Sequence, residues 1–116
     1  MTSTRTLPAD LPSTIRDYLA AHDAHDVEGA LRAFTPTAVV VDDGTTYRGT
    51  DELRRFLARA GTQYRYTTEL VGARRVDDGR WVVTNRLEGD FPGGVVELGY
   101  RFTLDGDLVA ELVIAP

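Results

Sequence analysis

The 116-residue chain contains neither cysteine nor lysine. The absence of cysteine excludes disulfide bonds, thiolate nucleophiles and thiolate metal ligands. The absence of lysine excludes Schiff-base catalysis. The two serines, Ser3 and Ser13, lie near the N-terminus and not in the strand–serine–helix turn of a serine hydrolase. The reactive side chains that remain favour proton transfer and polarisation of a substrate over covalent attack.

Long apolar runs and basic clusters are also missing. No stretch approaches the roughly 20 apolar residues of a membrane-spanning helix, and the N-terminal MTSTRTLPADLP lacks the apolar core of a signal peptide. The formal net charge of -5 and the pI of about 4.9 argue against a nucleic-acid-binding surface. No glycine-rich phosphate-binding pattern occurs. We therefore expect a cytoplasmic protein that binds neither nucleic acid nor membrane.

The length indicates a single domain over residues 1–116, with residues 1–8 as a flexible N-terminus. Asp26 and Thr50 are predicted to cap the second and third of three helices, and Pro36 ends the second. Apolar residues at helical spacing mark the three helices: Leu11, Ile15, Tyr18, Leu19 and His22; Val27, Ala30, Leu31 and Phe34; Leu53, Phe56, Leu57 and Ala60.

The sequence after Gly61 is typical of β-strands. It is rich in β-branched and aromatic residues and is divided by turn signals at residues 77–79, 91–94 and 105–106. Short turns predict an antiparallel meander. The predicted fold class is α+β, with three N-terminal helices packed on the concave face of a curved, cone-shaped antiparallel sheet. Such a cone leaves a pocket at its open end.

The third of these strands has two different faces. Its apolar set should face the helices, and consists of Val96, Leu98, Tyr100, Phe102 and Leu104. The alternating set is mixed rather than wholly polar, and consists of Val95, Glu97, Gly99, Arg101 and Thr103. A mixed outer face suggests packing on another subunit. We therefore expect a homodimer formed through the outer face of the sheet.

Three segments carry a resemblance to a known family: AHDAHDVEGALRAF, TAVVVDDGTTYRGTDELRRFL and FPGGVVELGYRFTLDGDLVAELVIAP. Together they resemble the SnoaL-like branch of the nuclear transport factor 2-like superfamily, over nearly the whole chain. The resemblance implies a cone-shaped α+β barrel, usually dimeric, with a pocket between helices and sheet. It implies function poorly, because the superfamily includes isomerases, cyclases, dehydratases and transport factors.

A more distant resemblance to the ketosteroid isomerases concerns individual residues. Tyr18 falls where those enzymes have an oxyanion-hole tyrosine, and Asp42 falls where they have the proton-shuttling carboxylate. In this interpretation Asp42 takes a proton from the carbon next to a carbonyl while the Tyr18 hydroxyl stabilises the enolate. Leu98 stands where those isomerases have a second, acidic donor. Loss of one such donor typically slows catalysis about 10²–10³-fold.

The residues to which these catalytic roles are assigned also have purely structural explanations. Asp42 could simply end a strand before an Asp43-Gly44 turn, and the apolar residues before it do not say which face meets the pocket. Tyr18 could be an ordinary core tyrosine. His22 and His25 have no clear third partner for a metal. The sequence therefore predicts neither a metal site nor a cofactor.

The predicted pocket is lined by six further residues, His22, Phe56, Tyr66, Trp81, Leu98 and Tyr100. Three hypotheses for the function remain open. The first is an acid/base isomerase or cyclase that acts on a hydrophobic carbonyl compound, with Asp42 as base and Tyr18 as donor. The second is a module that binds a small hydrophobic ligand without catalysis. The third is a structural or partner-binding dimer with a filled cone.

Overall fold

The chain begins with helices and ends with strands, as the sequence predicts. The computed structural model describes residues 11–60 and 66–116, so the expected flexibility of residues 1–8 lies outside the described residues. No helix within these ranges is long and apolar enough to span a membrane. In chain order the elements are α1 (Ser13–Asp23), α2 (Val27–Leu31), β1 (Phe34–Asp42), β2 (Thr45–Arg48), α3 (Gly49–Ala60), β3 (Tyr66–Asp77), β4 (Arg80–Gly89), β5 (Val95–Asp105) and β6 (Leu108–Ala115).

Six strands form one sheet in the order β2-β1-β6-β5-β4-β3. Strands β3 to β6 form the expected antiparallel meander. The sheet departs from a purely antiparallel one where β1 pairs in parallel with β6, with Val40 opposite Leu112. The run from Val39 to Val41 is apolar on both faces, as is typical of strands in parallel pairs that are covered on both sides.

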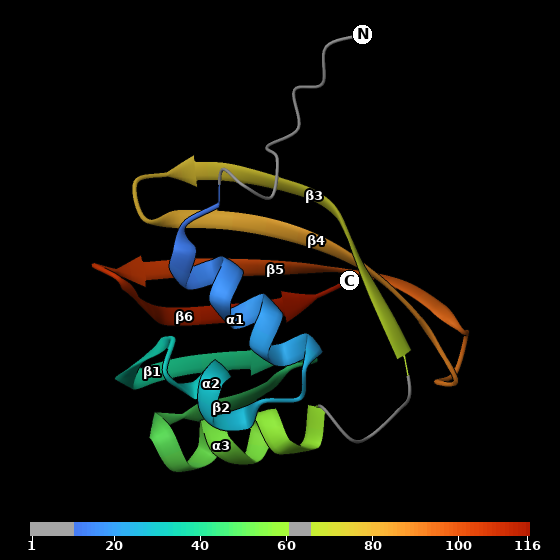
Figure 1. The fold of residues 1–116 in the computed structure, drawn as a ribbon, viewed down its shortest axis with the longest axis horizontal. Coiled ribbons are helices and arrows are strands. Elements are labelled where there is room, and N and C mark those ends of the chain that lie inside the picture. Colours follow the sequence, from blue (N-terminus) through green and yellow to red (C-terminus); the bar gives the residue numbers. More distant parts are fainter. Residues whose placement is uncertain (1–10, 61–65) are drawn as a thin grey trace, which may run out of the picture.

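The helices lie on the concave side of the curved sheet, and α1 crosses it (Figure 1). Ile15 and Tyr18 of α1 are fully buried against the sheet. Complete burial of an apolar side chain of this size contributes about 1.5–3 kcal/mol. The core also contains Leu53, Phe56 and Leu57 of α3 and, from the sheet, Val40, Val83, Phe102, Val109 and Leu112. The α+β cone predicted from the sequence is confirmed.

The two helix starts after α1 have different local causes. The Asp26 Oδ1 atom accepts a hydrogen bond from the Gly29 backbone N–H at 3.0 Å, so Asp26 is the predicted N-cap of α2. The expected N-cap at Thr50 is wrong, because α3 already begins at Gly49. Gly49 has φ 79, a left-handed conformation that permits the abrupt change from β2 to helix. Glu52 Oε1 then accepts a hydrogen bond from the Arg48 backbone N–H at 2.8 Å.

Candidate functional site

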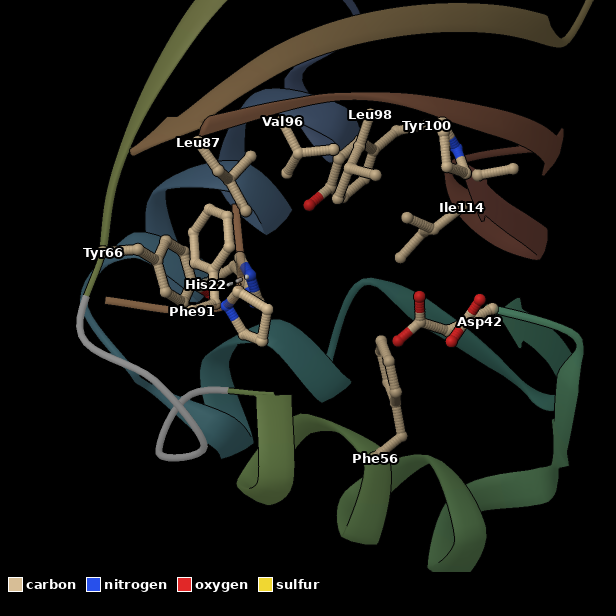
Figure 2. A pocket seen from close by; sticks show the side chains of 14 residues that line it. His22, Asp42, Phe56, Tyr66, Leu87, Phe91, Val96, Leu98, Tyr100 and Ile114 are labelled. Carbon is tan, nitrogen blue, oxygen red and sulfur yellow. Dashed lines mark hydrogen bonds between the residues drawn. The ribbon is translucent and has the colours of Figure 1, made fainter. Parts of the chain in front are cut away.

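A cavity of about 380 Å³ opens between the sheet and the helices. Its wall is mainly apolar and includes several aromatic side chains, and carboxylate groups lie at the end of β1 (Figure 2). A volume of this size falls in the range of small-molecule sites in proteins. The lining residues are His22, Asp42, Asp43, Phe56, Tyr66, Leu87, Phe91, Pro92, Val96, Leu98, Tyr100, Ile114, Ala115 and Pro116.

The end of β1 brings Asp42 to the cavity. Asp43 and Gly44 have φ values of 51 and 79 and form the predicted tight turn, which leaves Asp42 as the last residue of the strand. Asp42 shares a face with Ala38 and Val40, which are both fully buried. The structure thus answers the question that the sequence left open, because this face of β1 is the concave one.

The surroundings of Asp42 favour its protonated form more than water does. Partial burial is the main cause that raises the pKa of Asp42, and the neighbouring Asp43 raises it further. Arg59 acts in the opposite direction with a smaller effect. A carboxylate with a raised pKa at the wall of an apolar cavity is a better proton acceptor than one in water, because its conjugate acid is weaker.

Tyr18 is fully buried behind the cavity wall and is not part of the lining. Its ring stacks on His22 with centroids 5.9 Å apart and meets the Phe102 ring edge-on at 5.7 Å. Its hydroxyl is the one buried side-chain polar atom without a hydrogen-bond partner in the described part of the chain. Burial is the main cause that raises the pKa of Tyr18 well above its ordinary value, and Tyr100 is the next.

His22 and Tyr66 join the end of α1 to the start of β3. The His22 Nε2 atom and the Tyr66 hydroxyl are 3.2 Å apart, and both residues line the cavity. Burial lowers the pKa of His22 below its ordinary value, so the imidazole is neutral near pH 7. A neutral imidazole either accepts the hydrogen bond from the tyrosine or donates to it, depending on its tautomer.

The structure brings together six of the eight residues that the sequence singled out. They are Asp42, His22, Phe56, Tyr66, Leu98 and Tyr100. Tyr18 lies behind the wall, and Trp81 is not at the cavity. Trp81 pairs with Phe102 on the concave face but stands six positions before Leu87 on β4, about 20 Å away at the rise of a strand. Alternation along β4 identifies the face of Trp81 but not its depth in the cone.

Asn85 is a polar residue of the site region that the sequence analysis missed. Its side chain is 3% exposed and shares the inward face of β4 with Val83 and Leu87. It forms a side-chain hydrogen bond with Tyr100 that lowers the pKa of the phenol, while burial, the larger effect, raises it. The signal was present in the sequence, because Asn85 interrupts the apolar positions of an alternating strand.

Within residues 11–60 and 66–116, no three His, Asp or Glu side chains come close enough to hold a metal ion. His22 faces the cavity, where Tyr66 is its hydrogen-bond partner. His25 lies in the connection between α1 and α2 and has a positive φ of 57.

The sequence matches the SnoaL-like domain over residues 15–112. The chain belongs to the SnoaL-like domain family. Among solved structures, this SnoaL-like protein is similar to a Sinorhizobium meliloti protein provisionally described as a polyketide cyclase. The two are 30% identical with a TM-score of 0.88, and the match covers 95% of this chain and 100% of that one. The family predicted from the sequence is thus confirmed.

Two more distant structures share the fold. The Δ5-3-ketosteroid isomerase from a Mycobacterium species is 20% identical, with a TM-score of 0.72 and 90% coverage of each chain. TerC, co-crystallised with polyporic acid, is 18% identical, with a TM-score of 0.77 and coverage of 89% of this chain and 88% of that one. A search of curated proteins finds no match to the SnoaL-like chain.

Proposed function

We propose that this SnoaL-like protein binds a small hydrophobic carbonyl compound in the cavity and catalyses proton transfer next to the carbonyl group. The observation that carries the proposal is Asp42, a carboxylate with a raised pKa on the wall of a mainly apolar cavity. Asp42 accepts a proton from the carbon next to the carbonyl, and the resulting enolate is reprotonated or attacks a second carbon. These outcomes correspond to an isomerase and a cyclase.

The Tyr18 hydroxyl is the proposed donor to the enolate oxygen. It is a buried donor with no partner of its own in the described residues, a condition that a ligand oxygen would relieve. Because Tyr18 lies behind the wall, its contact with a ligand requires the intervening side chains to shift. A positioned donor of this kind stabilises the negative charge that develops on oxygen as the proton leaves carbon.

The similar structures are consistent with small-molecule chemistry in this fold. The S. meliloti protein carries a provisional cyclase description, and TerC was crystallised with polyporic acid. An open cavity of about 380 Å³ also favours ligand binding over a cone filled by its own side chains. Binding without catalysis is the alternative function, since the same cavity could hold an apolar ligand while no proton moves.

Deuterium exchange into 2-tetralone, a fused-ring ketone with acidic hydrogens beside its carbonyl, tests the proposal. The protein should accelerate exchange in D₂O, and Asp42→Asn should lower the enzymatic rate about 10²–10⁴-fold. Asp43→Asn is the matched control, because asparagine tolerates the positive φ of 51 at this position and removes a charge next to the base. Binding of 2-tetralone without accelerated exchange would favour the non-catalytic alternative.

We also propose that the protein forms a homodimer through the outer face of the sheet. On this face the Val95 side chain is 50% exposed, beside a mixture of charged and apolar neighbours. Arg86 and Glu97 lie directly opposite each other there, on adjacent strands. Sedimentation velocity tests the proposal, and a monomer at micromolar concentration would contradict it.

A further inference from the structure

The Tyr100 hydroxyl reaches the cavity directly. Tyr100 lines the cavity, and its hydroxyl points into the open space below Val96 and Leu98 (Figure 2). Tyr18, by contrast, is fully buried and does not belong to the lining. A ligand can therefore meet the Tyr100 hydroxyl without rearrangement of the wall. Among the tyrosines that line the cavity, Tyr66 already has His22 as a hydrogen-bond partner.

The strand register places Tyr100 and Asp42 on either side of Ile114. Ile114 of β6 lies opposite Asp42 of β1 and also opposite Tyr100 of β5. Directly paired residues share a face, and neighbouring strands are about 4.8 Å apart, so the backbones of Asp42 and Tyr100 are about 10 Å apart. Figure 2 shows the Ile114 side chain between them. A flat ligand above Ile114 can turn a C–H bond to one side and an oxygen to the other.

Asn85 is a buried polar neighbour of Tyr100. Asn85 lies opposite Leu98 on the neighbouring strand and is 3% exposed. A side-chain hydrogen bond joins Asn85 and the Tyr100 hydroxyl. If the Asn85 amide N–H donates this bond, the phenol proton stays free for a ligand oxygen. A hydroxyl that accepts one hydrogen bond also becomes a stronger donor in the next. The buried Asn85 side chain thus fixes the position of the Tyr100 hydroxyl.

The charge around Tyr100 keeps it a donor. Burial is the main cause that raises the pKa of Tyr100 well above its ordinary value, with smaller effects from Tyr66 and from the negative charge of Asp42. The phenol therefore keeps its proton at neutral pH. Among residues 11–60 and 66–116, the lining also contains two carboxylates, Asp42 and Asp43, and no arginine. A neutral ligand is therefore favoured over an anionic one.

On the basis of the proposed function, we propose that Tyr100 is the catalytic residue that donates a hydrogen bond to the substrate carbonyl oxygen, with Asn85 as its positioning residue. The substrate class is a neutral ketone that presents its oxygen and an adjacent C–H bond along one edge. The proton passes from carbon to the Asp42 carboxylate, the C–H electron pair moves into the enolate, and Tyr100 stabilises the oxygen. The proton then returns from Asp42 to carbon, so no oxidant or other reactant is consumed.

Binding of 2-naphthol tests this role, because its ionised form resembles an enolate. The Asp42→Asn protein is the background, since a neutral residue at this position imitates the protonated base and does not repel the anion. Ultraviolet absorbance separates bound naphtholate from bound naphthol. Tyr100→Phe in this background should weaken naphtholate binding about 10²-fold. Tyr47→Phe, which removes a hydroxyl outside the cavity lining, should leave the affinity unchanged.

Naphthalene, which has no oxygen, separates loss of the donor from collapse of the cavity. We expect Tyr100→Phe to bind naphthalene as the background protein does. Asn85→Leu should reduce the ionised fraction of bound 2-naphthol while naphthalene binding is kept, and Asn85→Gln should restore part of that fraction. Three outcomes would each overturn the inference. Tyr100→Phe could weaken the binding of naphtholate and naphthalene equally, it could leave naphtholate binding unchanged, or neither ligand could bind to the background protein.

The two proposals can fail separately. If exchange into 2-tetralone depends on Asp42 but is the same in wild type and Tyr100→Phe, the proposed function stands and the role of Tyr100 is refuted. If wild type accelerates no exchange but naphtholate binding depends on Tyr100, the donor site exists and the proposed catalysis is refuted.

Discussion

Replacement of Tyr18 by phenylalanine should stabilise the fold. The Tyr18 hydroxyl is buried and has no hydrogen-bond partner in the described part of the chain, and such a group costs about 1–3 kcal/mol. The ring contacts with Phe34 and Phe102, at centroid distances of 5.4 Å and 5.7 Å, do not require the hydroxyl. We therefore expect Tyr18→Phe to raise the free energy of unfolding by about 1–3 kcal/mol. For a chain of this size, each kcal/mol raises Tm by about 4 °C.

Tyr100→Phe is the matched control, because the same atom is removed from a tyrosine whose hydroxyl does have a partner. The substitution breaks the hydrogen bond with Asn85 and leaves a 3% exposed amide unpaired. We expect it to lower the free energy of unfolding by about 1–3 kcal/mol. Removal of the hydroxyl group from Tyr18 and from Tyr100 should therefore change the free energy of unfolding in opposite directions.

Urea unfolding followed by far-ultraviolet circular dichroism measures both effects. The midpoints should move in opposite directions while the dependence on urea stays the same. A Tyr18→Phe protein that is less stable than wild type would refute the reasoning, because the hydroxyl would then have a partner in solution, such as a trapped water. If Tyr18 also donates to the enolate, the stabilised variant exchanges deuterium more slowly. A gain in stability with a loss in activity is typical of a group held in place for function.

Two predictions concern pH. Asp43 raises the pKa of Asp42, so Asp43→Asn should move the acidic limb of the exchange rate to lower pH, and an unchanged pH–rate profile would contradict this. Burial lowers the pKa of His22 from 6.5 in the folded state, so below pH 6.5 the unfolded chain binds more protons and stability falls with pH. When the pH is lowered from about 7.5 to about 5.5, the free energy of unfolding measured in urea should therefore fall less for His22→Gln than for wild type. Equal losses would show that another group is responsible.

The local features of the fold could be predicted from the sequence because their causes are local. Asp26 caps α2 as expected, and the Asp43-Gly44 turn ends β1 at Asp42. α3 begins at Gly49, two residues before the start that an N-cap at Thr50 predicts, because Thr50 is a good capping residue by type while the backbone turn is made at Gly49. The second helix was expected to include Phe34 and to end at Pro36, but α2 ends at Leu31 and Phe34 begins β1. Composition and periodicity thus describe elements and turns well, and they are less reliable at the ends of helices.

The parts of the site that could not be predicted depend on contacts between distant segments. The face of β1 that carries Asp42 became known only from the burial of Ala38 and Val40 in the folded sheet, since Val39 to Val41 are apolar on both sides. Trp81 has the right alternation, but its position along β4, six residues before Leu87, puts it far from the cavity. Asn85 was overlooked because its importance comes from a partner, Tyr100, on the neighbouring strand.

The parallel pairing of β1 with β6 joins two segments from opposite ends of the described chain. Such non-local pairs form late in folding, because a long loop must close before the contact stabilises it. Asp42 lies opposite Ile114, so this carboxylate takes its place on the cavity wall when β6 docks. A chain truncated before β6 would lack the strand that joins β1 to β5, so Asp42 and Tyr100 would not be held on one wall. Activity should therefore return during refolding only when β6 has paired with β1.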